Sequence, residues 1–499
     1  MNIARPLLRA STLLPHRAFV RDCQNPERAQ ARVWAETWRV LRRSPFWRGG
    51  AASLSDFALT TYDDYRDALT RSFAKERSEL SAEPILYWSE STGTTGPRKL
   101  FPITPTYRRQ FQTTTPAFLR GLTSRFPKLL SRPVLYFAAT KPVEFSPSGV
   151  EVGLISHFNY RTIPAFLRRL YGFPIEVLAS EESFSRWGPL YAVATDLSAM
   201  VGITPAAISR FFENLGANRA LYEPILAGRA QPPAPLPPAR LDDARRDLIR
   251  SVLDGGDDLG ALWPTLQAVI CWKSSTCGLQ LPALRRVVGG VPFVDATYSA
   301  TEGWMNVPRA DGAPGGPLHP GAHVFELLPL GMEPHARNLV PMWALEPGQS
   351  YELVLTTAMG LVRYRLQDVV TCTGYFHRSP IVHFSHKSAN QISLGPASVS
   401  EAELVEVLKQ LTRDRSCLVA PAASGRGLEL CVDEPIAPGE VSAVELALAE
   451  LNPIYRRYVA NGTLDPLTAR RVAPDHPSFA FKRGHAQTKP RLLVQEPLS

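Results

Sequence analysis

The stretch YELVLTTAMGLVRYRLQDVVTCTGYF, residues 351–376, decides the fold of this chain. It divides into β-branched and aromatic runs separated by short turns, a composition that favours strands. The run VFELLPL, residues 324–330, has the same character. From His323 onward, these runs therefore predict a small antiparallel sheet or barrel.

The sequence before this stretch alternates between short apolar runs and helical patterns. Helices are predicted after Thr104 and Thr204, because each threonine can cap a helix whose first residue is the following proline. Buried strands are predicted over residues 84–89, 134–139, 266–272 and 292–296. Alternating strands and helices predict the α/β fold class, with a large N-terminal α/β domain to which the sheet or barrel is appended.

A smaller domain is predicted beyond it. Ser400 and Glu403 form a capping-box pattern that begins a helix, and a strand at residues 427–434 and a helix at 438–451 follow. We therefore expect a large N-terminal domain over residues 1–378 and a C-terminal α+β domain over residues 379–499.

Composition excludes several classes of protein. Of the residues, 44% are hydrophobic and 20% are charged, as in ordinary globular proteins. The chain lacks a run of about 20 apolar residues, so we expect no membrane partner and a cytoplasmic location. The six cysteines show no metal-ligand spacing and are expected to be reduced. We expect the protein to be a monomer.

The charge pattern leaves two questions open. The net charge of +9 is interpreted as diffuse and suited to anionic substrates, because no nucleic-acid motif accompanies it. Residues 1–20 contain three arginines and no acid, which resembles an organelle transit peptide. An amphipathic surface helix is the alternative.

The segment SESTGTTGPRK, residues 89–99, directly follows a predicted strand. Backbone N–H groups and hydroxyls of such a loop can surround phosphate oxygens, and Lys99 can offset their charge. It does not fit the P-loop pattern, since Arg98 stands five residues after Gly93. A flexible surface loop is the alternative.

Two further segments suit the rest of a nucleotide. In YSATE, residues 298–302, an aromatic ring can stack on a base, and Glu302 can hold Mg²⁺ between phosphates. In YRLQD, residues 364–368, Asp368 can accept hydrogen bonds from two ribose hydroxyls. Taken alone, the first also fits a strand-end turn and the second a surface salt bridge.

The three segments, in this order, resemble the adenylate-forming superfamily. The flanking residues 351–376, FELLP at 325–329 and RGHAQTKPR at 483–491 resemble the Gretchen Hagen family of auxin-responsive acyl-acid amido synthetases. The resemblance implies the adenylate-forming ligase fold and a two-step reaction. A carboxylic acid and ATP, with Mg²⁺, give an acyl-adenylate and pyrophosphate, and an amine, such as that of an amino acid, then displaces AMP.

The resemblance also implies roles for matching residues. Tyr298 stacks on adenine with Thr301 nearby, Glu302 binds Mg²⁺, and Asp368 binds the ribose. Phosphates are held by Ser91, Thr92, Gly93, Thr94, Thr95 and Lys99.

The C-terminal part supplies two further cations by the same resemblance. Lys387 stands where the family usually has a hinge arginine, and Lys489 lies in an element that serves adenylation. Two residues depart from the family pattern: Gln367 replaces a glycine, and Ser398 replaces a lysine. Glutamine at a positive-φ position costs about 1 kcal/mol, so we expect the turn before Asp368 to be rebuilt.

Two other functions share these segments. An acyl-CoA ligase is the runner-up, although the C-terminal element fits amide formation better. A non-catalytic nucleotide or acyl-ligand sensor is disfavoured, because Lys99 and Lys489 sit at motif positions of a chain with only nine lysines.

The substrate pockets are less defined by the sequence. The nucleotide site is expected to be edged by Trp272, Ser274, Ser275 and Cys277. Trp304, Met305 and Phe325 suit either an acyl pocket or the core. Neither the acid nor the amine follows from these residues.

Overall fold

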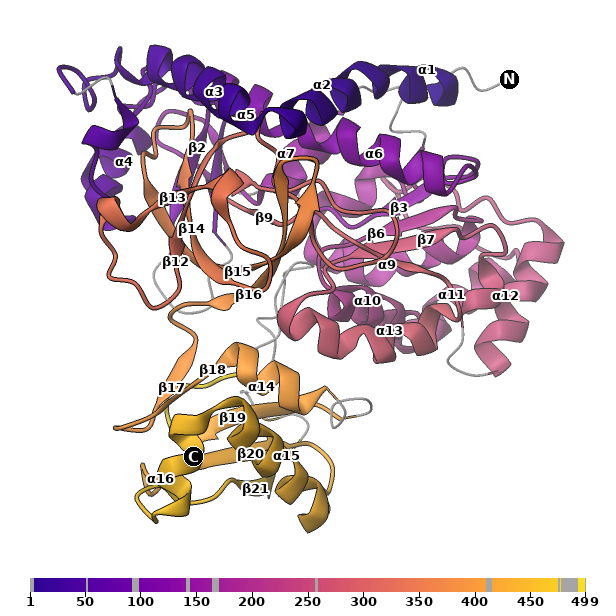
Figure 1. The fold of residues 1–499 in the computed structure, drawn as a ribbon. Helices are drawn as coiled ribbons and strands as arrows, with labels where there is room; N and C mark the ends of the chain where they lie inside the picture. The colour runs from indigo at the N-terminus through magenta and orange to yellow at the C-terminus, as the bar shows by residue number, and fades with distance from the viewer. Residues whose placement is uncertain are drawn as a thin grey trace.

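A computed structural model of the protein shows a large body and a smaller C-terminal unit below it (Figure 1). It describes residues 4–50, 53–91, 98–140, 144–163, 170–255, 259–409, 415–473, 476 and 492–498. The predicted residues Thr92, Gly93, Thr94, Thr95 and Lys489 lie outside these ranges.

One half of the large body is a parallel sheet between two layers of helices (Figure 1). The strand order is β3 (Val134–Tyr136), β6 (Ala199–Val201), β7 (Ala268–Cys271) and β8 (Phe293–Asp295). All four residues of β7 are buried, because side chains on both faces of the strand are covered. Val269 packs with the helices on one face, whereas Ile270 packs with α6 on the other.

The helices of this half have the following bounds: α6 (Thr114–Arg125), α9 (Glu181–Ala194), α10 (Pro205–Ala217), α11 (Arg219–Leu226), α12 (Asp243–Gly255) and α13 (Leu281–Val288). The predicted cap of α10 is confirmed, since the Thr204 side chain accepts a hydrogen bond from the Ala207 N–H. Thr104 begins a helix without making such a bond.

A second sheet carries the predicted phosphate loop. Its order is β2 (Leu100–Ile103), β1 (Tyr87–Glu90), β5 (Glu151–Gly153) and β4 (Glu144–Phe145). The helices beside it are α4 (Arg66–Phe73), α5 (Pro105–Phe111) and α7 (Ile155–Arg161). The antiparallel pairing of β1 and β2 brings the two ends of the predicted loop together.

The third sheet contains the stretch with which the sequence analysis began. Its order is β11 (Gly316–Pro317), β16 (Ser379–Lys387), β15 (Tyr364–Phe376), β14 (Ser350–Thr356), β12 (Val324–Pro329) and β13 (Val340–Pro341), all antiparallel. The sheet is confirmed, but the barrel alternative is wrong. In the described pairing the two-residue strands β11 and β13 end the ladder, so the sheet stays open.

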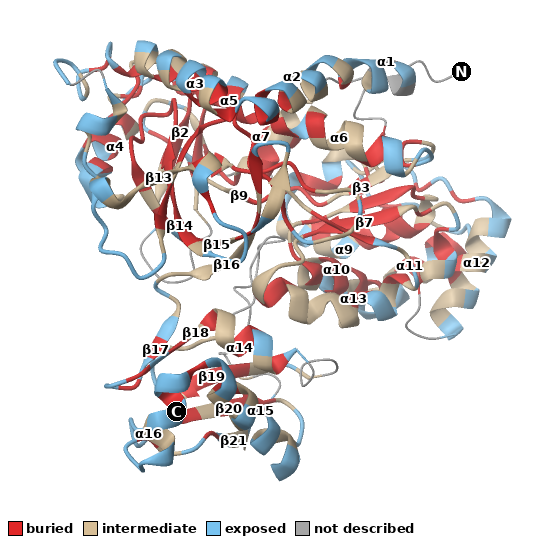
Figure 2. Ribbon diagram, viewed as in Figure 1, coloured by how far each residue is buried: buried red, intermediate tan, exposed pale blue. Residues whose placement is uncertain are grey.

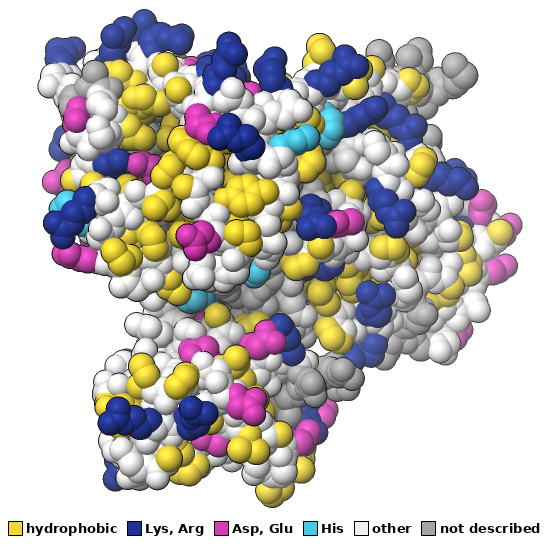
Figure 3. Space-filling model, viewed as in Figure 1, with side chains coloured by type: hydrophobic (Ala, Val, Ile, Leu, Met, Phe, Trp, Pro, Cys, Tyr) yellow, Lys and Arg dark blue, Asp and Glu magenta, His cyan; other side chains and the backbone are white. Residues whose placement is uncertain are grey.

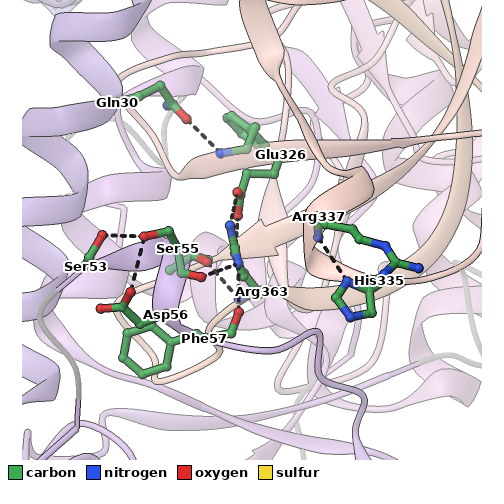
Figure 4. Close-up of polar contacts among 11 residues, drawn as sticks. Gln30, Ser53, Ser55, Asp56, Phe57, Glu326, His335, Arg337 and Arg363 are labelled. Atoms are coloured by element: carbon green, nitrogen blue, oxygen red, sulfur yellow. Dashed lines mark hydrogen bonds and ion pairs between the residues drawn. The ribbon is translucent and has the colours of Figure 1, made fainter.

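A buried ion pair fixes the start of β15 (Figure 4). The Arg363 guanidinium donates to both carboxylate oxygens of Glu326 on β12, at 2.9 and 2.6 Å, and to the carbonyls of Ser55 and Phe57. Arg363 is 6% exposed and has φ +48°. Because a guanidinium with four acceptors is well satisfied, this contact holds β15 against the loop at residues 53–57.

Three consecutive helices lie along the top of the molecule (Figure 1): α1 (Ala4–Ser11), α2 (Leu13–Gln24) and α3 (Pro26–Leu41). Phe19 and Cys23 of α2 are buried, as are Val33 and Leu41 of α3. The surface-helix alternative for the N-terminal residues is therefore confirmed over the part that the structure describes. Gln30 also ties α3 to β12, because its side chain accepts a hydrogen bond from the Phe325 N–H.

The C-terminal unit has its own core (Figure 2). Its elements are β17 (Gln391–Ser393), β18 (Ser398–Ser400), α14 (Glu401–Leu408), β19 (Cys417–Pro421), β20 (Leu428–Val432), α15 (Pro438–Leu451), α16 (Pro453–Ala460) and β21 (Thr468–Arg471). The capping box of Ser400 and Glu403 is present. These elements confirm the predicted helices and strands of this unit.

The predicted division between residues 378 and 379 falls inside the third sheet. It separates β15 from β16, which pair from Asp368 and Lys387 to Phe376 and Ser379. The polar residues there form the turn of a hairpin. In the sequence such a turn resembles a linker between domains, because turns and linkers are both exposed. We therefore propose a boundary after Lys387 instead.

Candidate active site

A cluster of charges lies near the start of β15 and at the end of β16. The Tyr298 hydroxyl donates to Asp368 Oδ2 at 2.7 Å, and the Lys387 ammonium forms an ion pair with Asp368 Oδ1. Asp368 is 4% exposed and Tyr298 is 7% exposed. The two strands set this geometry, because Asp368 and Lys387 are directly opposite each other in their register.

The residue before Asp368 keeps the conformation of the glycine that it replaces. Gln367 has φ +59°, a left-handed conformation that costs a side-chain-bearing residue about 1 kcal/mol. It lies in a bulge, where β15 shifts its register against Glu352 and Val354 of β14. The expectation of a rebuilt turn is therefore wrong: the strain is retained, and Asp368 keeps its place.

Glu302 lies beside this cluster and is 8% exposed. It lies in the turn between β9 (Ser299–Ala300) and β10 (Gly303–Trp304) and accepts a hydrogen bond from the Tyr364 hydroxyl at 3.3 Å. Burial raises the pKa of the Glu302 carboxyl, while the positive charges of Lys387 and Lys99 act to lower it. We call Tyr298, Glu302, Asp368 and Lys387 the carboxylate cluster.

The two acids, Asp368 and Glu302, keep the Lys387 ammonium protonated. Burial lowers the pKa of its ammonium, but Asp368 and Glu302 together outweigh burial and raise it. Burial, and then the charge of Asp368, raise the pKa of Tyr298. At neutral pH the cluster thus holds a protonated lysine and a neutral phenol.

The hairpin that carries Glu302 is joined to the phosphate loop. The Thr301 hydroxyl donates to the Glu90 carbonyl at 3.4 Å, and the Thr301 carbonyl accepts from the Tyr107 hydroxyl at 3.1 Å. The Ser91 N–H donates to the Lys99 carbonyl at 2.9 Å, which closes the loop at its neck. Ser91 and Lys99 therefore stand at the base of the predicted loop, near Glu302.

Lys99 itself lies over an aromatic ring. Its ammonium is 5.3 Å from the centre of the Tyr62 ring, and the Tyr62 hydroxyl accepts from the Leu100 N–H. The neighbouring Arg98 instead pairs with Glu90 and Glu144. Of these two cations, Lys99 is thus the one that remains available to bind phosphate.

A pocket opens next to Tyr298. It is lined by Trp272, Ser274, Ser275, Thr276, Cys277, Asp295, Ala296, Tyr298, Ser299, Gly315 and Phe384. The predicted edge of the nucleotide site thus lies at this pocket. Three of its residues are aromatic, so a flat base would find rings to stack on.

Two hydroxyls of the pocket lack a partner. The Oγ atoms of Ser274 and Ser275 are buried and make no hydrogen bond with any described group. Ser275 also has φ +54°, which costs a residue with a side chain about 1 kcal/mol or more. Buried polar groups are normally paired, so this serine wall, Ser274 and Ser275, fits a polar ligand edge.

Asp295 supports the floor of the pocket. Its carboxylate accepts from the Lys273 N–H at 3.0 Å and the Gly315 N–H at 2.6 Å. Burial raises the pKa of Asp295 to about 6, and these N–H donors act against that rise. The carboxylate therefore ties β8 to the segment after β7 and to the turn before β11.

The structure also shows where the remaining predicted residues lie. Met305 and Phe325 are fully buried in the core of the large body, and Trp304 packs against Phe111 with ring centres 5.2 Å apart. Cys277 is buried, and Ser398 is exposed on β18. The core alternative therefore holds for Met305 and Phe325.

The sequence analysis missed four residues of this site. Tyr364 and Tyr107 hold Glu302 and Thr301, Phe384 lines the pocket, and Asp295 supports it. Tyr364 begins the quoted YRLQD motif, but its partner lies 62 residues away in sequence. No local pattern reveals such a contact.

Comparison with solved structures identifies the class of fold. AtGH3.15 acyl acid amido synthetase in complex with 2,4-DB is similar at a TM-score of 0.80, with 18% identity over 96% of this chain and 94% of that one. 2-Hydroxyisobutyryl-CoA ligase in the postadenylation state is similar at 0.54, with 11% identity over 94% and 89%. The protein has the fold of the adenylate-forming ligases.

Sequence comparison then gives the family. The GH3 family N-terminal domain matches residues 17–293, and the GH3 family central domain matches residues 316–387. The chain belongs to the GH3 family. It is 26% identical to the putative indole-3-acetic acid-amido synthetase GH3.10 of Oryza sativa subsp. japonica, over 73% of this chain and 76% of that protein. It is 25% identical to indole-3-acetic acid-amido synthetase GH3.8 of Oryza sativa subsp. indica, over 87% and 81%.

Proposed function

We propose that this chain is an ATP-dependent acyl acid amido synthetase that joins a carboxylic acid to the amino group of an amino acid. The observation that carries the proposal is the placing of the carboxylate cluster beside an aromatic pocket with an unsatisfied serine wall. Membership of the GH3 family and the names of its relatives support the same reaction.

In the first half-reaction, an acid oxygen attacks the α-phosphorus of ATP, and the bond to pyrophosphate breaks. The adenine lies in the aromatic pocket, with Tyr298 against its face and the serine wall at its polar edge. Asp368 still has lone pairs for ribose hydroxyls after its bonds to Tyr298 and Lys387, since a carboxylate offers about four acceptor sites. Lys99 and the loop after Ser91 offset the phosphate charge.

Glu302 is the residue suited to Mg²⁺. It is a buried carboxylate that accepts from the Tyr364 hydroxyl and from its own backbone N–H, so it retains hard oxygen acceptors for a cation. Within the described ranges no three acidic, histidine or cysteine residues form a metal cage. That arrangement fits Mg²⁺, which is commonly held by one carboxylate, phosphates and water, and which stabilises charge on the phosphates when bound.

In the second half-reaction, the amine nitrogen attacks the acyl carbon, loses a proton and expels AMP. Because the acyl group is already activated, no enzyme nucleophile is needed, and burial raises the pKa of the Cys271 thiol near the pocket rather than activating it. Lys489 lies outside the described residues, and its role in adenylation stays a prediction.

We also propose a cytoplasmic, monomeric enzyme. The six cysteines form no disulfide, as expected of a reducing compartment. Among the described residues, no helix is both long and apolar enough to cross a bilayer.

An acyl-CoA ligase is the second candidate, because the fold is shared with 2-hydroxyisobutyryl-CoA ligase. ATP–pyrophosphate exchange over a panel of carboxylic acids, followed by addition of amino acids or CoA and mass spectrometry of the product, separates the candidates. We expect exchange with at least one acid and an amide product. A thioester alone would identify a CoA ligase, and nucleotide binding without exchange would identify a sensor.

A further inference from the structure

The positive charge of the chain is concentrated near its N-terminus. Residues 1–50 contain ten arginines, no lysine and only three acidic residues, against a net charge of +9 for all 499 residues. The rest of the chain is therefore close to neutral. The expectation of a diffuse charge is wrong: residues 4–41, which form α1 to α3, hold seven arginines and three acids, and three more arginines follow at 42, 43 and 48.

The structure places these arginines on one solvent face. On α2, Leu14, Arg17 and Arg21 are three and four residues apart, which sets them on the same side of the helix. The same spacing continues along α3 and its C-cap. We define the basic ridge as the exposed residues Arg17, Arg21, Arg28, Arg32, Arg39 and Arg42. Figure 3 shows basic side chains along this upper edge of the molecule.

The acids of these helices neutralise only part of the ridge. Asp22 is buried and pairs with two ridge residues, Arg32 at 2.8 Å and Arg21 at 3.9 Å. Glu27 and Glu36 pair with arginines from elsewhere in the chain, at positions 378 and 109. Arg17, Arg28, Arg39 and Arg42 make no ion pair with a described residue. Like charges three or four residues apart repel each other, so the ridge has an excess of unsatisfied guanidinium groups.

Exposed apolar side chains stand near both ends of the ridge. Leu14 is 73% exposed at one end, and Phe46 is 38% exposed at the other, between the exposed Arg43 and Arg48. Large apolar side chains next to guanidinium groups suit the boundary between lipid headgroups and acyl chains. A nucleic-acid strand would use the arginines but would leave Leu14 without a role.

We propose that the basic ridge docks the protein on a membrane surface that contains anionic phospholipid. Guanidinium groups bind phosphate in bidentate fashion, and Leu14 and Phe46 enter the interface. The helices stay packed on the body through their buried faces, so attachment is peripheral. Each arginine near an anionic surface strengthens binding about fivefold, and the gain falls as salt screens it. The proposal is independent of the proposed catalytic function.

The test is co-sedimentation of the full chain with phosphatidylcholine vesicles, with and without phosphatidylserine. The ridge variant combines Arg17→Glu, Arg21→Glu, Arg39→Glu and Arg42→Glu. The matched control changes four exposed arginines elsewhere, at the same cost in net charge: Arg229→Glu, Arg240→Glu, Arg456→Glu and Arg457→Glu. Circular dichroism and ATP binding check that each variant is folded.

Wild type and control are expected to pellet with the anionic vesicles only, and to be released by high salt. The ridge variant is expected to bind at least 100-fold more weakly. Leu14→Ser alone should weaken binding by a smaller factor. Absence of wild-type binding, or equal loss in both charge variants, would overturn the proposal. So would tight binding of a single-stranded DNA oligonucleotide through the ridge without binding of vesicles.

Discussion

The two sides of the candidate nucleotide site differ in how their polar groups are satisfied. In the carboxylate cluster, every acid has a protein partner: Tyr298 and Lys387 bind Asp368, and Tyr364 binds Glu302. In the serine wall, the buried hydroxyls of Ser274 and Ser275 have none among the described residues. The cluster is thus complete without ligand, whereas the wall is not.

This difference separates the residues that are already paired in the free protein from those that a bound ligand would pair. An unpaired buried hydroxyl costs about 1–3 kcal/mol, and a ligand that pairs it recovers part of that cost. A completed cluster instead presents its charges in a fixed arrangement, which needs little reorganisation during reaction. Changes in the cluster should therefore lower activity, and changes in the wall should weaken binding while sparing stability.

The largest effect is expected for Glu302→Gln. An amide oxygen is a weaker Mg²⁺ ligand than a carboxylate, so ATP–pyrophosphate exchange should fall by about 10²–10³-fold, with partial recovery in excess Mg²⁺. The matched control is Glu352→Gln, since Glu352 is a buried carboxylate on β14 that pairs with Arg365. Exchange at the wild-type level in Glu302→Gln would remove Glu302 from the site.

Asp368→Ala should weaken ATP binding by about 10–100-fold, because each charged hydrogen bond to a ribose hydroxyl contributes about 1.5–3 kcal/mol. Calorimetric titration with ATP measures this loss. Titration with 2′,3′-dideoxy-ATP is the control: it should bind wild type and variant alike. An equal loss with both nucleotides would show that Asp368 acts only through Lys387.

The support of the pocket should be sensitive to pH. The pKa of Asp295 is raised to about 6 in the folded protein, so its contribution to stability is greatest in acid and is lost as pH rises through 6. Relative to Asp295→Asn, wild type should lose about 1 kcal/mol of unfolding free energy between pH 5 and 7. Urea denaturation at several pH values measures it. A difference that stays constant with pH would contradict the raised pKa.

The smallest effect is expected for a variant that relieves the backbone strain next to the carboxylate cluster. Gln367→Gly should stabilise the fold by about 0.5–1 kcal/mol, because glycine adopts positive φ without strain. Thr373→Gly is the control at an exposed position of the same strand without positive φ, and it should destabilise. Thermal denaturation compares them. Equal destabilisation by both would show that Gln367 is unstrained.

Much of the fold follows from local signals in the sequence. The strand runs of residues 351–376 and the caps at Thr204 and Ser400 depend on near neighbours, and these predictions are confirmed. The helix predicted after Thr104 ends at Phe111 as α5, and a second helix, α6, follows it. The strand order of the third sheet, in which β16 lies between β15 and the distant β11, depends on pairing between segments far apart in the sequence, which local composition does not specify.

The residues of the site divide in the same way, into those that local patterns predict and those that depend on distant contacts. Asp368 and Glu302 stand out because their motifs are short, the first within a strand-rich stretch and the second just after a predicted strand. Tyr364 and Phe384 do not, since their roles arise only when sheets from distant segments meet. The missing partners of the serine wall are likewise visible only in three dimensions, because composition does not show which hydroxyl is buried.

Ser274→Ala tests the account most directly, through unfolding free energy and ATP affinity measured on the same protein. Removing a buried, unpaired hydroxyl should raise stability by up to about 1 kcal/mol, while ATP should bind several-fold more weakly because a hydrogen bond to the base is lost. Loss of stability with unchanged ATP affinity would contradict the account, since Ser274 would then be a packing residue and not part of a nucleotide site.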